Sequence, residues 1–392
     1  MKIDLTNGVK YIIDTLSASG YEAYVVGGAV RNSLISRAVD DFDITTSAAP
    51  CEIKEAFKHL RTIDTGIKHG TVTVIYEGAP YEITTYRVDG EYDDNRHPAS
   101  VEFTRNLKDD LARRDFTVNA MCYNDTLGLV DLYGGREDLA NKTIRTVGDP
   151  TRRFTEDALR VLRALRFASV LNFEIEEGTS RAIRELYHLL ANVSNERILS
   201  EMKKLLAGDG AYRVVSDYFD VIGFIFTELC GTALPNREGF LSADVNTRLA
   251  AIFILNSDSP ALAIDAALQR LRSDNKTRNL LSGAINAYFN AKFDTVSGIL
   301  RGLARYGADE MTLCANILAL INADNDAPNR LSAILCANPV YRVRDLSVGG
   351  KELESLGYRG TEIGNALERV LYAVIDGECT NSREAIFKFL AR

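Results

Sequence analysis

The sequence predicts an α+β fold, in which an N-terminal domain with a mixed β-sheet precedes a long, all-helical remainder. Extended, strand-like runs, such as residues 22–30 and 71–77, lie in the first 150 residues and nearly vanish after that. Beyond residue 151, helical spacing of apolar residues dominates instead, in segments 155–171, 178–191, 196–207, 246–256, 260–272, 278–290 and 360–376. The composition, 46% apolar and 26% charged, is that of a packed globular protein.

This change of character predicts a domain boundary at about residue 150. A chain of 392 residues is long enough for two to four domains at roughly 100–200 residues each. We therefore divide the chain into residues 1–150, 151–225, 226–325 and 326–392, and no internal repeat is evident.

Several classes of protein are disfavoured by the composition. No run approaches the roughly 18 apolar residues of a membrane span, so we expect no membrane association. The six cysteines are scattered without a C-x-x-C pair, which argues against a zinc ribbon or a disulfide framework and favours a reduced, cytoplasmic setting. The net charge of −8 means that any nucleic-acid contact must come from a local basic patch.

The first domain contains four predicted strands, at 22–30, 39–46, 71–77 and 81–88. The last two flank Gly-Ala-Pro, which predicts a hairpin loop. A helical pattern covers 50–60, and the polar segment 89–100 is typical of a mobile loop.

Paired glycines follow the first strand in "VVGGAVRN". Gly27 and Gly28 allow a sharp turn and a close approach of backbone N–H groups to phosphate, and Arg31 lies three residues after Gly28, where it could pair with that phosphate. The spacing is neither that of a P-loop nor G-x-G-x-x-G. By itself the pattern indicates a plain turn equally well.

Three carboxylates lie close together in "VDDFDITT". Because side chains alternate along a strand, Asp41 and Asp43 should share one face while Phe42 and Ile44 supply the buried face. Two adjacent carboxylates repel unless a cation lies between them, and oxygen ligands favour Mg²⁺. A polar edge strand is the alternative, and the upstream Gly-Gly-x-x-Arg favours the metal site.

Two neighbouring carboxylates have other interpretations. We place Asp40 as a solvated residue at the strand entrance. Glu82, on the strand at 81–88, is the best candidate for a third carboxylate of a two-metal site, although an ordinary strand glutamate explains it equally well.

An arginine-rich helix is predicted at 155–171. With Asp157 at 0° and about 100° per residue, Arg160, Arg163 and Arg166 fall near 300°, 240° and 180°, opposite an apolar arc. Three arginines at this spacing gain little from each other, so they indicate an anionic ligand. Between 142 and 166, seven basic residues against three acidic ones form the local basic patch.

Asp157 and Arg160 suggest a base-reading pair. Cytosine and adenine each present an amine donor beside a ring-nitrogen acceptor, which a carboxylate and a guanidinium can satisfy. Uracil and guanine present the reverse order and would leave both groups unsatisfied, so the pair could select C and A.

The ordered motifs "GGAVRN", "DFDITT", "TGIKHGTVTV", "EITTYRVDGEYDDNRHP", "RRDFTVNAM" and "EDALRVLRALRFA" resemble those of class II tRNA nucleotidyltransferases, the bacterial CCA-adding enzymes of the polymerase-β-like superfamily. The resemblance spans at least residues 20–170. Less specifically, "SVGGKELESLGYRGTEIGNAL" resembles the family's C-terminal region.

The resemblance implies a role for each matching residue. Asp41 and Asp43 would be the catalytic metal ligands, with Mg²⁺ as the cofactor. The nucleotide-binding set it implies is Gly28, Arg31, Arg114, Asp157, Arg160, Arg163 and Arg166. One departure is visible: the family usually has Asp after the arginine of Gly-Gly-x-x-Arg, and this chain has Asn32.

The implied architecture is a catalytic head (1–150), a neck with the nucleotide-reading helix (151–225), a body (226–325) and a tail contacting tRNA (326–392). The implied activity is template-independent addition of CCA to the 3′ end of tRNA from CTP and ATP, with release of pyrophosphate after in-line attack of the tRNA 3′-hydroxyl on the α-phosphate.

Four alternatives stay open at this point. They are a bacterial poly(A) polymerase, an enzyme that adds only CC or only A, a non-catalytic RNA-binding protein and a small-molecule nucleotidyltransferase. The presence of segment 89–100 disfavours CC-only addition, and the long helical remainder exceeds what a small substrate needs. The sequence leaves open whether the protein is a monomer or a homodimer.

Overall fold

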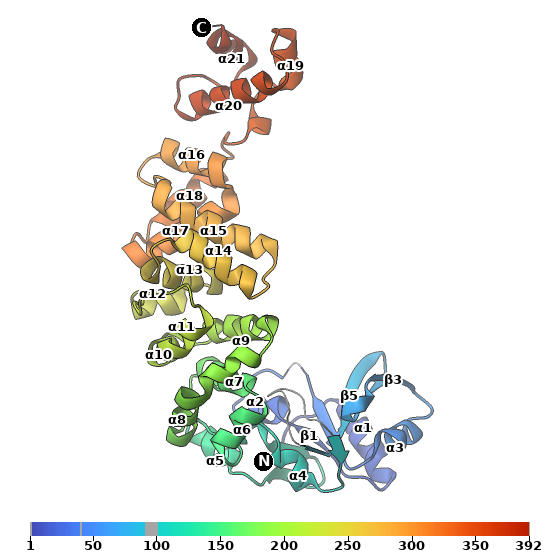
Figure 1. Cartoon of the computed structure of the whole chain (residues 1–392). Helices are drawn as coiled ribbons and strands as arrows, with labels where there is room; N and C mark the ends of the chain where they lie inside the picture. Colours follow the sequence, from blue (N-terminus) through green and yellow to red (C-terminus); the bar gives the residue numbers. More distant parts are fainter. Residues whose placement is uncertain (1, 40, 91–100, 392) are drawn as a thin grey trace. The chain divides into compact units, whose positions relative to one another are not determined.

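The computed structural model describes residues 2–39, 41–90 and 101–391 (Figure 1). The chain divides into two compact units, Met1–Ile225 and Phe226–Arg392. The N-terminal unit contains a β-sheet with flanking helices, and the C-terminal unit is helical in its described residues, so the predicted α+β class is confirmed. Asp40 and residues 91–100, the greater part of the predicted loop, lie outside the described residues.

A seven-stranded mixed sheet in the order β3-β4-β5-β2-β1-β8-β9 forms the centre of the N-terminal unit. The β2–β5 pair is parallel and the other neighbours are antiparallel. The strands are β1 (Ala23–Val26), β2 (Asp43–Thr46), β3 (Arg61–Gly66), β4 (Thr71–Tyr76), β5 (Ala79–Thr85), β8 (Met121–Asn124) and β9 (Gly128–Asp131). Two smaller pairs are β6 (Arg87–Asp89) with β7 (Val101–Phe103), and β10 (Thr143–Ile144) with β11 (Glu174–Ile175).

The helices of this sheet domain are short, apart from the first. They are α1 (Asn7–Ala18), α2 (Gly28–Leu34), α3 (Pro50–Ala56), α4 (Leu107–Ala112) and α5 (Gly135–Ala140), with 3₁₀ turns η1 (Ile67–His69) and η2 (Thr117–Asn119). Helices α1 and α3 contact each other beside the sheet (Figure 1). Tyr24 and Val26 of β1 instead pack with Leu111 of α4, so alternate residues of β1 serve different parts of the core.

The hairpin between β4 and β5 confirms the predicted turn and shifts it by one residue. Tyr76 pairs with Ala79, which leaves Glu77 and Gly78 as the two-residue loop. Both have positive φ, 51° and 79°, as in the two-residue turns that match strand twist. Gly78 adopts this conformation without the cost of a side chain, whereas Ala and Pro of the predicted loop already belong to β5.

Seven helical segments complete the N-terminal unit. They are α6 (Pro150–Glu156), α7 (Leu159–Leu171), α8 (Glu177–Leu186), the 3₁₀ helix η3 (Tyr187–Asn192), α9 (Asn195–Ala207), α10 (Ala211–Asp217) and α11 (Phe219–Ile225). Helix α7 is almost entirely buried and packs against α9. The predicted continuous helix 155–171 is wrong, because the chain leaves the helical conformation at Asp157, with φ −138° and ψ 102°.

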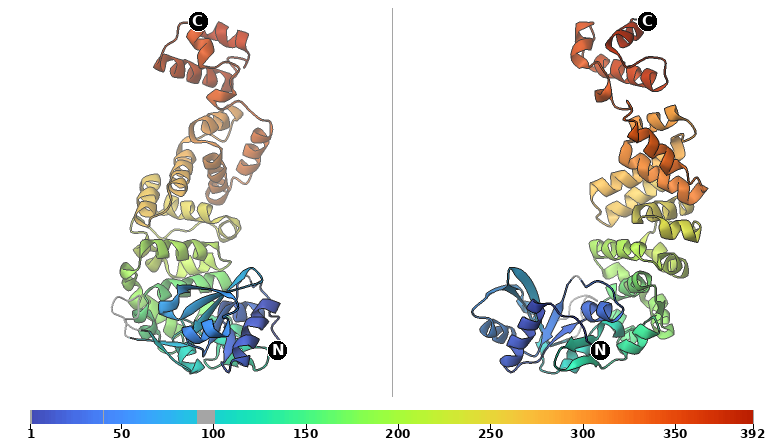
Figure 2. Two further views of the ribbon diagram at one scale, coloured as in Figure 1. Left: turned by 90° about the vertical axis from the view of Figure 1, so that its right-hand side faces the viewer. Right: turned by 180° about the vertical axis from the view of Figure 1, so that it is seen from behind.

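The C-terminal unit is built from ten helices and one short 3₁₀ turn in its described residues (Figure 2). They are α12 (Arg237–Ser242), α13 (Val245–Asn256), α14 (Pro260–Arg270), α15 (Asn275–Asn290), α16 (Val296–Tyr306), α17 (Ala308–Asn322), α18 (Ala327–Cys336), η4 (Val343–Asp345), α19 (Gly350–Ser355), α20 (Thr361–Ile375) and α21 (Arg383–Leu390). Separate buried clusters lie within residues 287–341 and 346–386. Across the described chain, each helix is too short or too polar to cross a membrane.

Candidate active site

The paired glycines and the carboxylates meet because β1 and β2 are antiparallel. Val26 pairs with Asp43, so Asp43 lies beside the residue that precedes Gly27 and Gly28. Gly27 has φ 75°, a conformation that favours glycine, and its N–H donates to the carbonyl of Met121 at 3.2 Å. Gly27 and Gly28 therefore form a turn next to Asp43, and α2 begins at Gly28.

Two arginines lie against this turn. A Cβ on Gly27 would be 3.4 Å from Nη1 of Arg114, and a Cβ on Gly28 would be 3.7 Å from Nη2 of Arg31. Gly28, Arg31, Arg114 and Asp43 thus lie around one turn, contributed by α2, β2 and the residues just after α4, and their role in binding phosphate stays a prediction.

The two carboxylates are neighbours, although only one lies in the strand. Asp41 precedes β2, and Asp43 is its first residue; both are exposed. Although Asp43 keeps contact with solvent, the surrounding protein removes part of its hydration and so raises its pKa; Arg114 acts to lower this pKa, and the nearby charge of Asp41 acts to raise it. The predicted alternation holds for Ile44, which is buried, while Phe42 is only half-buried.

Within residues 2–39, 41–90 and 101–391, no third carboxylate is grouped with this pair. Glu82 of β5 is exposed, and among the residues that the structure describes no group of three or more His, Cys, Asp or Glu side chains could hold a metal. Among the described residues, the neighbouring Asp41 and Asp43 are the carboxylates that could supply oxygen donors here. Such a pair fits a cation that takes its other ligands from water and phosphate, which is how Mg²⁺ is commonly bound.

Asp110 is a buried acid that the sequence argument missed. Its oxygens accept from Nη2 of Arg113 at 2.7 Å and from Nη2 of Arg114 at 3.4 Å, and from the hydroxyl of Thr45 at 3.3 Å. Thr45 lies two residues after Asp43 on the same face of β2. Asp110 therefore ties Arg114 to the strand that begins with Asp43. An acid three and four residues before two arginines was the available signal.

Three of the predicted arginines surround one aromatic ring. The guanidinium carbons of Arg31, Arg163 and Arg166 lie 5.0, 5.5 and 3.7 Å from the ring centroid of Phe167. In this arginine cluster, Arg31 of α2 lies beside Arg163 and Arg166 of α7. Helical spacing grouped Arg163 with Arg166, and the resemblance added Arg31 to the same set, but only the tertiary structure places all three around Phe167.

The members of the arginine cluster differ in their counter-charges. Arg163 is paired with Asp115 and Arg166 with Glu201, each with a shortest contact of 2.5 Å. Arg31 instead donates to two neutral amides, to Oδ1 of Asn119 at 2.5 Å and to Oδ1 of Asn32 at 2.9 and 3.1 Å. Burial and then the charge of Arg166 lower the pKa of Arg31 to about 10. Arg31 is thus a buried cation suited to an anionic ligand.

Asp115 and Asn119 hold the cluster together, and both were missed. Asp115 accepts from Arg163 and, at 3.0 Å, from Nδ2 of Asn119, whose Oδ1 accepts from Arg31. Although burial acts to raise it, the pKa of Asp115 is held well below its usual range, chiefly by Arg163 and Asn119. The single amide of Asn119 therefore bridges an acid and a cation on different elements.

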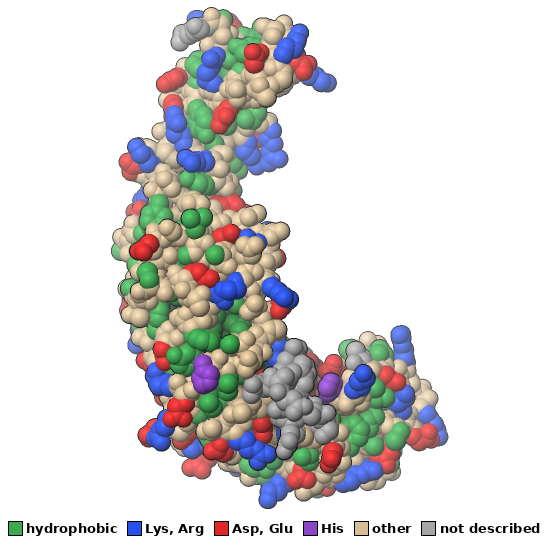
Figure 3. Space-filling view, in the orientation of Figure 1, with side chains coloured by type: hydrophobic (Ala, Val, Ile, Leu, Met, Phe, Trp, Pro, Cys, Tyr) green, Lys and Arg blue, Asp and Glu red, His purple; other side chains and the backbone are tan. Residues whose placement is uncertain are grey.

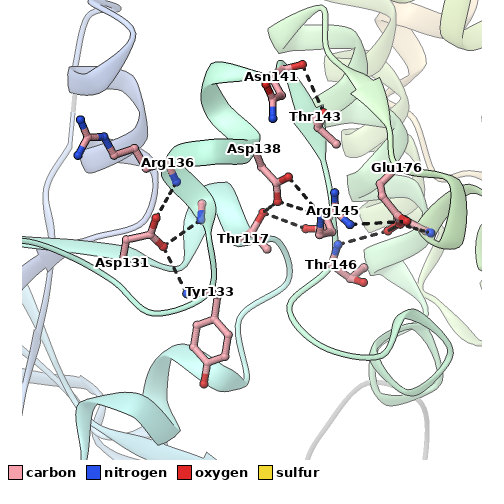
Figure 4. Close-up of polar contacts among 12 residues, drawn as sticks. Thr117, Asp131, Tyr133, Arg136, Asp138, Asn141, Thr143, Arg145, Thr146 and Glu176 are labelled. Carbon is pink, nitrogen blue, oxygen red and sulfur yellow. Dashed lines mark hydrogen bonds and ion pairs between the residues drawn. The ribbon is translucent and has the colours of Figure 1, made fainter.

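A polar network behind the site fixes the turn that carries Asn119 (Figure 4). The hydroxyl of Thr117 donates to Asp138 at 2.6 Å, and Nε of Arg145 donates to both oxygens of Asp138 at 3.1 Å. Arg145 also lies 3.7 Å from Glu176, on the connection between β11 and α8. This network anchors η2 to α5 and to the chain around β10.

Asp157 and Arg160 do not share one helix face as the sequence predicted. Asp157 lies at the corner between α6 and α7, where its Oδ1 accepts from the N–H of Leu159 at 3.1 Å. That local bond competes with helix continuation and explains the break. Arg160 donates to Oε2 of Glu156 at 2.8 Å and to the carbonyl of Arg113 at 2.9 Å. Their base-reading role stays a prediction.

Asn32→Asp tests the absence of a counter-charge at Arg31. A carboxylate in place of the Asn32 amide would turn neutral hydrogen bonds into charge-assisted ones, so we expect the unfolding free energy at pH 7 to rise by about 1 kcal/mol. A carboxyl whose folded-state pKa is lowered stabilises above its unfolded value of about 4, and the gain is lost as pH falls through the folded value. Urea unfolding at pH 7 and pH 4 measures this. Equal stability of both proteins at pH 7 would contradict it.

Comparisons with known proteins identify the family to which the chain is similar. A family model described as "Poly A polymerase head domain" matches residues 23–145, and one described as "Probable RNA and SrmB- binding site of polymerase A" matches residues 172–220. The chain is 38% identical to the CCA-adding enzyme of Lactobacillus helveticus over 388 residues, 97% of this chain and 95% of that protein. It is 37% identical to that of a Geobacillus species over 397 residues, with the same coverage.

Solved structures show the same likeness. The CCA-adding enzyme of Bacillus stearothermophilus in complex with CTP superimposes with a TM-score of 0.78 at 31% identity, covering 97% of this chain and 95% of that one. The CCA-adding enzyme of Thermotoga maritima complexed with tRNA superimposes with a TM-score of 0.68 at 22% identity, covering 98% of this chain and 94% of that one. At this identity the likeness is one of fold. Since relatives above 30% identity match it over nearly its whole length, the chain belongs to the class II CCA-adding enzymes, whose catalytic part is the poly A polymerase head domain.

Proposed function

We propose that this chain adds CCA to the 3′ end of tRNA, using CTP and ATP and releasing pyrophosphate. The observation that carries the proposal is the convergence of Asp43, Arg31 and Arg114 on the Gly27–Gly28 turn, in a chain whose relatives share its length. The ligands of the related structures, CTP in one and tRNA in another, support the same substrates for this chain.

Asp41 and Asp43 are the residues that would hold Mg²⁺. The bound ion would supply neutralisation of the triphosphate and a lowered pKa for the attacking hydroxyl. The protein's own contribution is positioning and fixed positive charge. The Gly27–Gly28 turn lets the triphosphate approach the backbone, and Arg31 and Arg114 lie where they would face its oxygens. A bond forms between the tRNA 3′-oxygen and the α-phosphorus as the bond from that phosphorus to the leaving pyrophosphate breaks.

Base choice is assigned in this proposal to Asp157 and Arg160. They lie three residues apart at the corner where α6 meets α7, and Arg160 is held by the carbonyl of Arg113, the residue beside Arg114. A base bound beside this corner would meet an acceptor and a donor in the order that cytosine and adenine satisfy.

Arg160→Ala is expected to relax selection of C and A over U and G by about tenfold or more, because the guanidinium would no longer discriminate the ring nitrogen. Incorporation of all four nucleotides under single-turnover conditions measures it. Arg152→Ala is the matched control, since Arg152 also pairs with Glu156 but is 73% exposed. If Arg160→Ala lowers thermal stability but leaves nucleotide selectivity as in wild type, Arg160 has only a structural role and the base-reading assignment is refuted.

Three tRNA substrates test the activity itself. One lacks all three terminal nucleotides, one lacks only the final A, and one is complete; each is incubated with CTP, ATP or both, and the products are sequenced. Ordered addition of C, C and A that then stops supports the proposal. Activity only on the second substrate indicates an A-adding enzyme, long A tails a poly(A) polymerase, and binding without product a non-catalytic RNA-binding protein.

The division into head, neck, body and tail at residues 150, 225 and 325 belongs to this proposal, as does tRNA contact by residues 326–392. A cytoplasmic location is also proposed, and it rests on the absence of any disulfide among the described cysteines.

A further inference from the structure

Arg197 lies beside the predicted base-reading carboxylate of Asp157, although it belongs to another helix. It is in the first turn of α9, and its Nη2 is 3.6 Å from Oδ2 of Asp157. The other oxygen of Asp157 accepts from the N–H of Leu159 at 3.1 Å. Because α9 packs against α7, the position of Arg197 is set by the fold, and Asp157 has a neighbour at each of its two oxygens.

This pair differs from the ordinary surface ion pairs of the same unit. On the face of the molecule drawn in Figure 3, Lys and Arg side chains are interspersed with Asp and Glu side chains, as is typical of a solvated surface. Arg181 and Glu177 of α8, for example, are paired but 67% and 88% exposed. The side chains of Arg197 and Asp157 are only 31% and 19% exposed, so water and salt screen their attraction less.

The surroundings of Arg197 are unfavourable for a residue that only stabilises the fold. Its Nη1 is buried and has no hydrogen-bond partner among the described residues, and an unsatisfied buried donor costs free energy. A cation in the first turn of a helix also opposes the helix dipole. Both costs fall on the guanidinium, and they indicate that its role lies with the carboxylate beside it and not with α9 itself.

Helix α9 contacts a second member of the predicted nucleotide-binding set. Glu201 lies four residues after Arg197, on the same face of α9, and it pairs with Arg166 of α7 at 2.5 Å. One helix face therefore carries a cation beside Asp157 and an anion beside Arg166. The positions of both groups depend on α9 as well as on their own segments, so α9 can determine how precisely Asp157 is oriented.

We propose that Arg197 is a positioning residue for base selection, which restrains the Asp157 carboxylate so that it accepts the amine of cytosine or adenine. The inference rests on the proposed function, in which Asp157 and Arg160 read the base. The terminal torsion of an aspartate is broad, so the single hydrogen bond from Leu159 leaves the carboxylate room to rotate. Without Arg197, a rotated carboxylate would reject the carbonyl oxygen of uracil less strictly.

Arg197→Met tests this proposal, because methionine keeps much of the side-chain volume and removes the charge. The preference for CTP over UTP, measured as the ratio of kcat/KM with tRNA that lacks CCA, should fall about tenfold. Arg197→Lys should recover part of this preference, since it restores a cation. The melting temperature of Arg197→Met should stay within about 3 °C of wild type, because the variant also removes the unsatisfied donor. Arg181→Ala, which removes an exposed arginine, is the matched control and should change neither quantity.

A double-mutant cycle shows whether Arg197 acts through Asp157. In the Asp157→Ala background, Arg197→Met should cause no further loss of preference, since the carboxylate that it positions is absent. An equal loss in both backgrounds, or an unchanged preference in the single variant, would overturn the proposal. Equilibrium binding of CTP and UTP gives the same comparison without catalysis. A protein that adds no CCA, but whose binding preference for CTP falls in Arg197→Met, supports the inference and refutes the proposed function; normal CCA addition with an unchanged preference in that variant does the reverse.

Discussion

Replacing Asp41 or Asp43 by asparagine is expected to lower the rate of nucleotide incorporation by at least about a thousandfold, with the fold intact. Each substitution removes one of two neighbouring carboxylate charges, and Asp43 pairs with Val26, the residue before the Gly27–Gly28 turn. A cation at a phosphoryl-transfer site contributes several kcal/mol, and each 1.4 kcal/mol corresponds to a factor of ten. Single-turnover addition of CMP to tRNA, over a range of Mg²⁺ concentrations, is the measurement.

Asp14→Asn is the matched control for this experiment. Asp14 is an exposed carboxylate on α1, and its loss should leave incorporation unchanged. Because Asp41 and Asp43 are exposed, their amides should fold normally, with thermal unfolding close to wild type. Turnover within a few-fold of wild type in both variants would refute the assignment of these carboxylates.

Asp115→Asn should have the largest effect on stability, lowering the unfolding free energy at pH 7 by about 3–5 kcal/mol. The substitution keeps the size of the side chain but removes the charge that Arg163 contacts in a buried setting, which leaves an uncompensated cation. It also disturbs Asn119 and, through it, Arg31. Urea unfolding gives the stability, and binding of CTP should weaken in parallel.

The stability difference between wild type and Asp115→Asn should depend on pH in a definite direction. The pKa of Asp115 is lowered in the folded state, so its contribution is complete above the unfolded value of about 4 and is lost as pH falls through the folded value. The gap between wild type and Asp115→Asn should therefore narrow below pH 4. Asp220→Asn is the control, since Asp220 is an exposed partner of Arg184 at 3.5 Å and its loss should cost about 1 kcal/mol or less. A gap that does not change with pH would argue against the buried ion pair.

Local patterns were sufficient for most elements. The predicted helices at 196–207, 246–256 and 260–272 match α9, α13 and α14 within two residues, because an amphipathic period is visible over three turns. Shorter elements were less well predicted. Strand β2 was predicted from residue 39 but begins only at Asp43. Helix α7 begins at Leu159, because the side chain of Asp157 accepts a hydrogen bond from the N–H of Leu159 and the helical conformation is interrupted there.

The residues of the candidate site also fall into two groups, those that local motifs predicted and those that they did not. Asp41, Asp43 and Gly28 were recognisable because each lies in a short motif whose chemistry depends on near neighbours. Asp115 and Asn119 were not, because their importance comes from partners far away in the sequence, whereas Asp110 has local partners in Arg113 and Arg114 and a distant one in Thr45. Asn119 contacts Arg31 across 88 positions, and Asp115 contacts Arg163 across 48.

The sequence by itself determined the α+β class, the two carboxylates, the Gly-Gly turn and the set of arginines available for an anionic ligand. Only the tertiary structure decided which of them meet. Antiparallel pairing of β1 with β2 brings Asp43 to the glycines, and the fold brings Arg31 to Phe167 and to the neutral amides of Asn32 and Asn119. Strand order and helix packing depend on burying apolar surface from distant segments, and no local pattern of residues encodes which segments those will be.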